Sequence, residues 1–323
     1  MKLPHGWSRA VPLFDDENLV SFAGLVPVMV LAEQAGLSEL IDERVAIGAT
    51  RVASAAVNPA GKLTSIIAGM AAGADSIDDL DVIRSGGMPR LFGGVYACST
   101  LGQFLREFTH GHGLQLASVA RAHLVGLVKR TGLLPGIATQ AYVDIDSLLR
   151  PVYGHAKQGA SFGHTKIAGR QVLRRGLSPL ATTISTEHGA PVVAGIRLRA
   201  GKAGSGKGAA SMVREAIGVA RAAGAAGEIL VRGDSAYGNS AVVGACVKAG
   251  VRFSVVLTKN RRGDPGRRHH CRGRLDAGAL PRRGPRPGYW AADLRRRGRR
   301  GAVHRVRVHP APGHRPADRA SGP

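Results

Sequence analysis

The chain has 323 residues, which is long enough for two domains of ordinary size. Its hydrophobic fraction of 44% is that of a globular protein. No apolar run reaches the ~18 residues of a membrane span, and the first residues lack the apolar core of a signal peptide. Three widely separated cysteines, Cys98, Cys246 and Cys271, argue against a disulfide framework or a zinc site and fit a reducing cytoplasm.

The net charge of +23 predicts a polyanionic partner, but most of that charge lies at the C-terminal end. Residues 261–323 contain 18 Arg, no Lys and four acids, for a net charge of +14. Residues 1–260 carry 27 basic and 18 acidic groups, for a net charge of +9. The first 260 residues are therefore only moderately basic.

Helical periodicity dominates from about residue 20 to about residue 135, after an irregular N-terminal arm. In the segment 62–72 the apolar side chains Ile66, Ile67 and Met70 fall on one face. We therefore expect a helical N-terminal domain over residues 1–137 with short connections. Its helices are predicted at 28–35, 62–72, 76–83, 101–108 and 116–127.

The pattern changes at Leu134-Pro-Gly136, and strands alternate with helices up to residue 260. A Gly- and Lys-containing stretch follows the first strand. The order of strand, hairpin, helix, strand, helix and strand predicts an α/β domain over residues 138–260, with a mixed sheet flanked by helices. Strands are predicted at 142–145, 180–185, 192–198, 229–231 and 253–257, and helices at 209–223 and 239–248.

The pattern ends abruptly after Asn260. Residues 261–323 contain eight Pro, ten Gly and clustered Arg, and show no sustained apolar periodicity. Such a segment cannot bury enough surface to offset its chain entropy, so we expect disorder. It is either a nucleic-acid-binding arm or the product of reading a GC-rich gene in the wrong frame. We favour the second because the break falls inside a regular βαβ-like pattern.

Two aspartates, Asp146 and Asp234, each end a β-prone apolar run, lie 88 residues apart and are followed directly by Ser. An unpaired carboxylate is costly to bury in an apolar strand, so we expect each at the strand mouth, near a counter-charge. Two such groups suit Mg²⁺ or Mn²⁺, which take oxygen ligands and often complete their shell with substrate phosphates. Alternatively, each Asp caps the turn that follows its strand.

Asp144 competes with Asp146 for the first of these two positions. Strand alternation places both side chains on the same face, since they are two residues apart. Asp146 lies nearer the strand end and precedes Ser147, so we expect it to be the metal ligand. We expect Asp144 either to lie next to this ligand without contacting the ion, or to be the ligand in place of Asp146.

Four segments together resemble the DDE transposases of bacterial insertion sequences, and particularly the IS1380 group within the wider IS4-like set. The likeness covers roughly residues 20–260 and is most specific in the two Asp-centred motifs. The segments are Tyr142-Val-Asp-Ile-Asp-Ser147, Gly154-His-Ala-Lys-Gln-Gly-Ala160, Leu198-Arg-Ala-Gly201 and Leu230-Val-Arg-Gly-Asp-Ser-Ala-Tyr-Gly238.

The resemblance implies an RNase H-like catalytic core behind a helical DNA-binding domain. It also implies that the protein cuts and joins DNA ends with two Mg²⁺ (or Mn²⁺) ions held by Asp, Asp and Glu. By motif match, Asp146 is the first acid and Asp234 the second. The implied partners are double-stranded DNA (the element's terminal inverted repeats and the target) and a second copy of the chain. The implied location is the cytoplasm, at the nucleoid.

The third acid of the family is missing from its expected place, a helix beyond Asn260, where the sequence shows no helical pattern. Asp264, Asp276 and Asp293 lie in the Arg/Gly/Pro-rich segment, and Glu187 lies at the tip of the predicted hairpin. We assign the role to none of them. The resemblance therefore implies a truncated or frame-disrupted transposase that is impaired in strand transfer.

Basic residues cluster around the acid-bearing segments, either to position DNA phosphates or as a solvated face. The segment 201–208 nearly matches a phosphate-binding loop, but Gly208 replaces the hydroxyl that would hold Mg²⁺.

The sequence leaves three candidate functions: a transposase, a non-catalytic DNA-binding remnant, and a disfavoured nucleotide-binding protein. The candidate phosphate contacts are Arg150, Lys157, Lys166, Arg199, Lys202 and Lys207.

Overall fold

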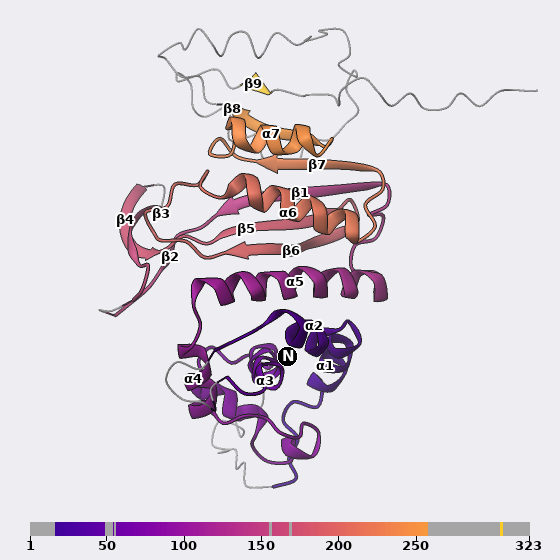
Figure 1. Cartoon of the computed structure of the whole chain (residues 1–323), viewed down its shortest axis with the longest axis vertical. Helices are drawn as coiled ribbons and strands as arrows, with labels where there is room; N and C mark the ends of the chain where they lie inside the picture. The colour runs from indigo at the N-terminus through magenta and orange to yellow at the C-terminus, as the bar shows by residue number, and fades with distance from the viewer. Residues whose placement is uncertain are drawn as a thin grey trace, which may run out of the picture.

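The computed structural model describes residues 17–48, 54, 56–154, 157–167, 170–257 and 304–305. Helices occupy the first part of the chain, and a sheet with two further helices occupies the second (Figure 1). None of the helices in these ranges is long and apolar enough to cross a membrane. The N-terminal helices are α1 (Leu25–Gln34), α2 (Leu37–Arg44), α3 (Pro59–Ala71), the 3₁₀ helices η3 (Asp78–Ile83) and η4 (Met88–Arg90), α4 (Cys98–Arg106) and α5 (His110–Arg130).

The main sheet has the strand order β6-β5-β1-β7-β8-β9. Its central strand β1 pairs antiparallel with β5 and parallel with β7, and β7 pairs parallel with β8. This is the mixed sheet that the sequence predicted, with the strand order of an RNase H-like core. The strands are β1 (Gln140–Ser147), β5 (Leu180–Thr186), β6 (Gly189–Arg197), β7 (Glu228–Gly233), β8 (Arg252–Leu257) and β9 (His304–Arg305).

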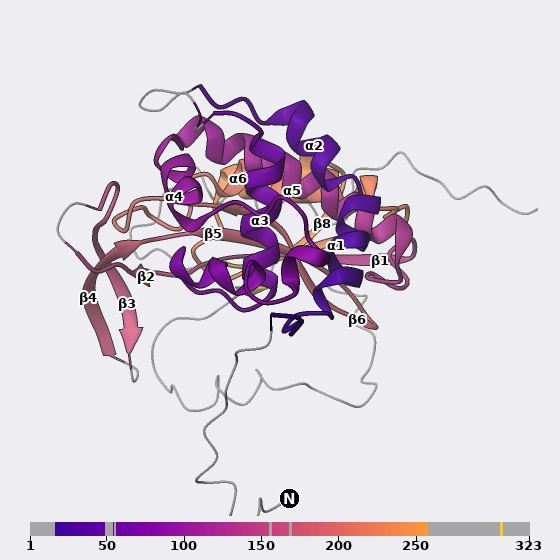
Figure 2. The same cartoon turned by 90° about the horizontal axis from the view of Figure 1, so that it is seen from below.

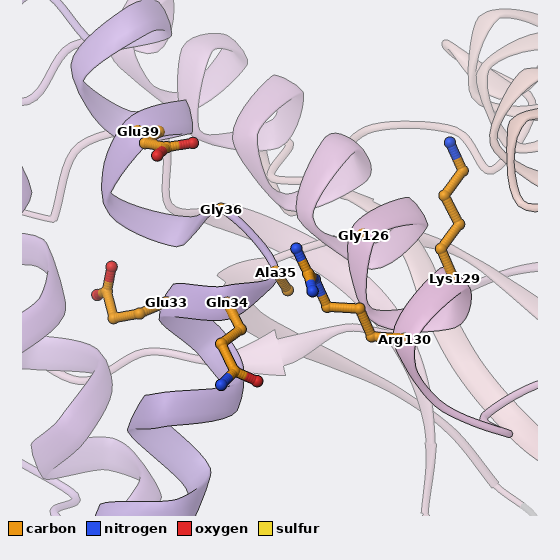
Figure 3. Close-up of a pocket in the computed structure, with 8 residues that line it drawn as sticks. All are labelled: Glu33, Gln34, Ala35, Gly36, Glu39, Gly126, Lys129 and Arg130. Carbon is orange, nitrogen blue, oxygen red and sulfur yellow. The ribbon is translucent and has the colours of Figure 1, made fainter.

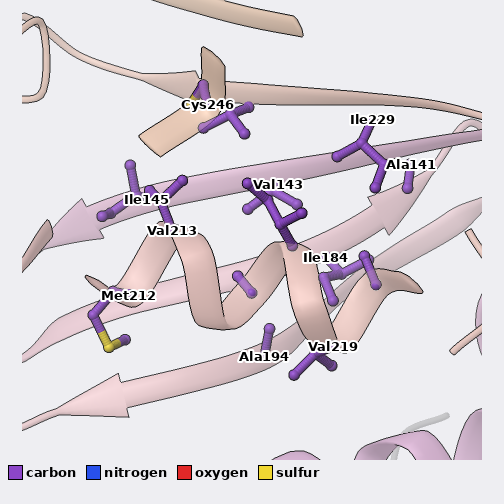
Figure 4. Close-up of a cluster of buried hydrophobic side chains, with 14 of the residues drawn as sticks. Ala141, Val143, Ile145, Ile184, Ala194, Met212, Val213, Val219, Ile229 and Cys246 are labelled. Atoms are coloured by element: carbon purple, nitrogen blue, oxygen red, sulfur yellow. The ribbon is translucent and has the colours of Figure 1, made fainter. Parts of the chain in front are cut away.

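Helices α6 (Ala209–Ala222) and α7 (Ser240–Lys248) pack against each other, α6 also contacting β1 and β5 and α7 contacting β8. Alternate residues of β1, including Val143 and Ile145, point into this buried core, and Val213 of α6 meets them there (Figure 4). The residues between them, including Asp144 and Asp146, therefore lie on the opposite face. Burial of one face thus fixes which side of the sheet carries the acids.

A small second sheet is inserted between β1 and β5, in the stretch for which the sequence predicted no strands. Its order is β2-β4-β3, and it extends sideways from the main sheet (Figure 2). We call β2, β4, β3 and their connections, residues 150–177, the arm. Its strands are β2 (Arg150–Pro151), β3 (Ser161–Ile167) and β4 (Arg170–Leu177).

Helix α5 joins the helical part to the sheet. Val119 belongs to a cluster of buried side chains from α1–α4, whereas Leu124 and Val128 belong to the core beneath the sheet. The predicted division at residue 137 therefore follows a helix that is shared between the two cores. Most of residues 261–323, for which we predicted disorder, lie outside the described residues; His304 and Arg305 pair with β8.

The apolar side chains that the sequence places on one face of α3 are only partly buried. Ile67 and Met70 are 36% and 65% exposed, whereas Ile66 packs against the helical core. Lys62 takes the inner position with 1% exposure, and its ammonium donates hydrogen bonds to the carbonyl oxygens of Ser54 and Val57. Burial lowers the pKa of this ammonium. Lys62 can occupy a buried position because backbone carbonyl oxygens accept hydrogen bonds from its ammonium.

Helix α5 approaches the corner between α1 and α2 at a glycine. A Cβ atom on Gly126 would lie 2.5 Å from the carbonyl oxygen of Ala35, and Figure 3 shows the two residues facing each other. A hollow beside this contact is lined with charges of both signs, including Glu39 and Arg130.

We predict that Gly126→Ala lowers the free energy of unfolding by about 1–2 kcal/mol, because the backbone oxygen must move to admit the methyl group. Gly113→Ala on the same helix is the control, since a Cβ there has no atom within 4 Å. It should stabilise the helix by about 0.5–1 kcal/mol. Urea unfolding of both variants checks the prediction, and equal shifts would contradict it.

Candidate active site

The two predicted acids end neighbouring parallel strands. Asp146 is the next-to-last residue of β1, and Asp234 directly follows β7. The last residues paired between these strands are Ile145 and Gly233, so the next register position sets Asp146 beside Asp234. Neighbouring strands lie about 4.8 Å apart. The fold therefore brings both carboxylates to one edge of the sheet.

Each carboxylate is oriented by the backbone through one oxygen. The amide of Ser147 donates to Oδ1 of Asp146 (2.7 Å), and the amide of Ala236 donates to Oδ1 of Asp234 (2.8 Å). Both acids thus make the turn-capping contacts that the sequence offered as an alternative to metal binding. Among the described residues, Oδ2 of each accepts no hydrogen bond and forms no ion pair, so capping leaves one oxygen of each acid free.

Tyr237 is a buried residue close to both acids. The residue is 1% exposed, and its hydroxyl makes no hydrogen bond of good geometry, although Ser147 is near enough to interact with it. Burial raises the pKa of the phenol, and the charges of Asp146 and Asp234 raise it further.

Asp144 has a different environment from the other two acids. Its carboxylate forms a two-pronged ion pair with Arg232, the residue opposite it on β7, at 2.6 and 2.7 Å. Arg232 also stacks over the ring of Tyr142, 4.5 Å from its centroid, and the bond to Asp144 raises the pKa of its guanidinium. The charge of Asp144 is compensated, while those of the neighbouring acids are not.

The loop 199–208 passes both acid-bearing turns. The hydroxyl of Ser205 lies 3.2 Å from that of Ser147, and a Cβ on Gly206 would lie 3.3 Å from Nδ2 of Asn239. The loop is held in shape by one guanidinium at its base. Arg199 donates hydrogen bonds to the carbonyl oxygens of Ser178, Gly204, Ser205 and Lys207.

This arrangement has the wrong polarity for a nucleotide site. A phosphate-binding loop turns its backbone N–H groups inward around an anion. In the loop 199–208 the carbonyl oxygens turn inward around a cation, and the amides of Ala203 and Lys207 are bonded to loop carbonyls. The near match to a phosphate-binding motif is therefore a structural loop.

The model of the family described as transposase DDE domain group 1 matches residues 8–265. This chain is a member of that family. A search of curated proteins gave no match. The shared carboxylate edge therefore lies within a DDE transposase domain.

The other predicted phosphate contacts of this DDE domain divide into three groups. Arg150 and Lys157 lie exposed on the arm, and Lys202 and Lys207 lie exposed on the loop. The side chain of Lys166 falls outside the described ones. Arg199, with its hydrogen bonds to four carbonyl oxygens, shapes the loop instead of reaching out from it.

No third acid joins the pair within the described residues, where no group of three or more His, Cys, Asp or Glu could hold a metal ion. Glu187 lies in the turn between β5 and β6. Because β5 runs antiparallel to β1, this turn is at the opposite end of the sheet from Asp146. The alternatives Asp264, Asp276 and Asp293 lie outside the described residues.

The pair nevertheless fits a divalent cation. Two carboxylate oxygens are free, uncompensated and pre-oriented, and hard oxygen donors of this kind suit Mg²⁺ or Mn²⁺. The hydroxyl of Tyr237 adds a buried polar atom that lacks a good partner beside them. A cation held by Asp146 and Asp234 would supply the positive charge that these two carboxylates lack.

Sequence reasoning missed Tyr237, Arg232 and the arm. The clearest unused signal was the distribution of charge within residues 1–260. Residues 147–214 hold eleven basic residues and one acid, whereas the rest of residues 1–260 holds 16 basic and 17 acidic residues. The whole positive excess of the DDE domain therefore lies between the end of β1 and α6.

We predict that Tyr237→Phe stabilises the metal-free protein by about 1 kcal/mol at neutral pH, because an unsatisfied buried hydroxyl is removed. Since the folded-state pKa of Tyr237 is raised, the unfolded chain loses this proton first, above the ordinary value of about 10. The wild type therefore loses stability from there up to the raised pKa, and the variant lacks that loss.

Urea unfolding in EDTA at pH 8 and pH 10.5 measures this difference. The stability gap between variant and wild type should widen at the higher pH. A gap that stays constant would contradict the raised pKa of the buried phenol.

Proposed function

We propose that this DDE domain hydrolyses phosphodiester bonds at insertion-sequence ends, with Asp146 and Asp234 as ligands of two Mg²⁺ or Mn²⁺ ions. The observation that carries the proposal is the β1–β7 register, which sets the two acids side by side. Their uncompensated charge supports it, since a structural acid at this position would have a cationic partner as Asp144 has in Arg232. The family match supports the DNA substrate.

The residues at and around the two acids have different proposed roles. Asp146 and Asp234 would hold the ions through their free oxygens, while Ser147 and Ala236 fix the orientation of these carboxylates. When bound, such ions activate a water or a DNA 3′-hydroxyl and stabilise the leaving oxygen. Asp144 fixes Arg232 beside the site, so that its cation remains close to the edge where a phosphate would bind.

We further propose that the chain is impaired in strand transfer. The family match ends at residue 265, close to the loss of regular pattern after residue 260. This coincidence supports a shift of reading frame near that codon, which would remove the helix that carries the third acid. The DNA sequence around codon 260 tests the proposed frameshift. If neither of the other two reading frames encodes a helix-forming segment that contains a Glu, the frameshift is ruled out.

The finer assignments are also proposals. We propose that the chain belongs to the IS1380 group, binds the element's terminal inverted repeats through its N-terminal helices, and acts as a homodimer on DNA at the nucleoid. The alternative function is a DNA-binding remnant that recognises the same ends without cutting them. The net charge of +23 favours DNA binding under either proposal.

A nicking assay separates the two functions. The substrate is a duplex that carries the inverted repeats found beside the gene, incubated with Mg²⁺, Mn²⁺ or EDTA. The proposed enzyme gives slow nicking that requires a divalent ion and gives no joined product, whereas a protein with the restored frame also joins the ends. Binding with no cleavage in either ion would favour the remnant.

A further inference from the structure

The arm carries charge of one sign. Residues 150–177 contain six basic residues, and the chain has no acid between Asp146 and Glu187. Four of these basic side chains are exposed, and a fifth, Arg175, donates a hydrogen bond to the carbonyl oxygen of Gly154. The exposed residues are Arg150, Lys157, Arg170 and Arg174. Because the arm contains no acid, its four exposed cations form no ion pair within it, and their charge faces solvent.

The arm has the shape of a narrow ribbon. Strands β3 and β4 pair antiparallel over seven residue pairs, from Ser161–Gly176 to Ile167–Arg170, which corresponds to a length of about 24 Å. Arg170 and Arg174 lie on one face of β4, because they are four residues apart. On the other face Phe162 and Leu173 are 61% and 54% exposed. Each face thus presents side chains to solvent.

Two glycines, Gly163 and Gly201, seat this ribbon on the loop 199–208. A Cβ on Gly201 would lie 2.2 Å from the carbonyl oxygen of Ser161 and 2.4 Å from that of Gly176, and a Cβ on Gly163 would lie 2.1 Å from the carbonyl oxygen of Gly201. The amide of Lys202 donates to the hydroxyl of Ser161 (2.9 Å). Such close backbone contact is possible only without side chains, and it fixes the direction of the arm.

The same loop touches the acids' strand. Ser205 contacts Ser147, the residue after Asp146, and the arm lies on the side to which the C-terminal ends of β1 and β7 point (Figure 1). A continuous series of contacts therefore runs from the carboxylate edge through the loop to the ribbon. The ribbon would hold whatever binds it in a fixed position relative to the acids.

We propose that the arm binds the backbone of duplex DNA that flanks the bond held at Asp146 and Asp234. This inference rests on the proposed function for the position of that bond, but not for binding itself. A two-stranded ribbon fits the major groove, and a length of about 24 Å spans roughly seven base pairs at 3.4 Å each. The arm's cations contact phosphates, so it adds affinity and register without sequence preference.

The test compares two charge-matched triple variants of the full chain. The arm variant carries Lys157→Ala, Arg170→Ala and Arg174→Ala. The control variant carries Arg214→Ala, Arg221→Ala and Lys248→Ala, three exposed residues on α6 and α7. Both retain residues 261–323, so the contribution of that Arg-rich segment is the same in each. Circular dichroism melts confirm that both variants fold.

Binding to a 30-bp duplex is measured by fluorescence anisotropy in EDTA over a series of salt concentrations. Loss of three phosphate contacts should reduce the slope of log affinity against log salt by about 2–3, since each contact contributes about 0.9. The control should keep the wild-type slope. An unchanged slope in the arm variant, or an equal reduction in both variants, would overturn the inference.

The inference about the arm and the proposed active site can be contradicted independently of each other. The arm variant could show a reduced salt dependence of DNA binding while nicking proves independent of Asp146 and Asp234. That result would support the inference about the arm and contradict the proposed active site. If nicking needs both acids while the arm variant binds as the wild type does, the active site stands and the inference falls.

Discussion

Asp234→Asn is expected to lower Mn²⁺-dependent nicking by a factor on the order of 10²–10³, the usual cost of removing one preorganised charge-stabilising group. Asparagine keeps the side-chain oxygen that accepts the hydrogen bond from the Ala236 amide, so the turn should persist. The substitution removes only the negative charge. Asp146→Asn should have an effect of similar size, because the register gives both acids the same relation to the shared edge.

Asp144→Asn is the matched control for this prediction. It lies on the same strand face, two residues from Asp146, but its charge is already compensated by Arg232. We expect nicking within about tenfold of wild type, since only the orientation of a half-exposed ion pair is lost. Equal losses in all three variants would show that the acids act through the fold and not through a cation. Retained activity in Asp234→Asn would remove that residue from the site.

Gly201→Ala is expected to have the largest effect among the single-methyl substitutions proposed for this fold. The new methyl group would meet two backbone oxygens, from Ser161 and Gly176, on two strands of the arm. Neither can turn away as a side chain would. We expect a loss of about 3 kcal/mol, at the upper end of overpacking costs, and a detachment of the arm from the loop.

Limited trypsin digestion reports that detachment directly, because β4 supplies cleavage sites at Arg170, Arg174 and Arg175. Cleavage within the arm should accelerate by at least about tenfold, which corresponds to 1.4 kcal/mol of easier local opening. Gly204→Ala in the same loop is the control, as a Cβ there has no atom within 4 Å. Similar cleavage rates in the two variants would show that the glycine contacts do not seat the arm.

The strands that position the acids were predictable from the sequence. In β1 and β7, β-prone apolar runs lead directly to an Asp, and burial of one face by α6 excludes a one-residue slip, which would turn the buried side chains to the other face. Helix α7 was predictable from its cap as well, because the Asn239 side chain accepts a hydrogen bond from the amide of Val242. Local pattern and tertiary structure agree at these elements.

The arm was not predictable in the same way. Strands β3 and β4 contain Gly163 and Gly176 and several basic residues, all of which disfavour a strand in isolation. They are strands because they pair with each other and because their glycines admit the loop at Gly201. Similarly, the burial of Lys62 depends on carbonyl oxygens that reach it only in the folded chain. Such features arise from contacts distant in sequence, which periodicity does not record.

The central claim is that Asp146 and Asp234 share bound cations, and a double-mutant cycle on Mn²⁺ affinity tests it most directly. Calorimetric titration of wild type, Asp146→Asn, Asp234→Asn and the double variant gives the four affinities. If the acids share ions, each single change should cost at least about tenfold in affinity, and the double change should cost little more than either alone. Losses that simply add, or single variants that bind Mn²⁺ as the wild type does, would contradict the shared site.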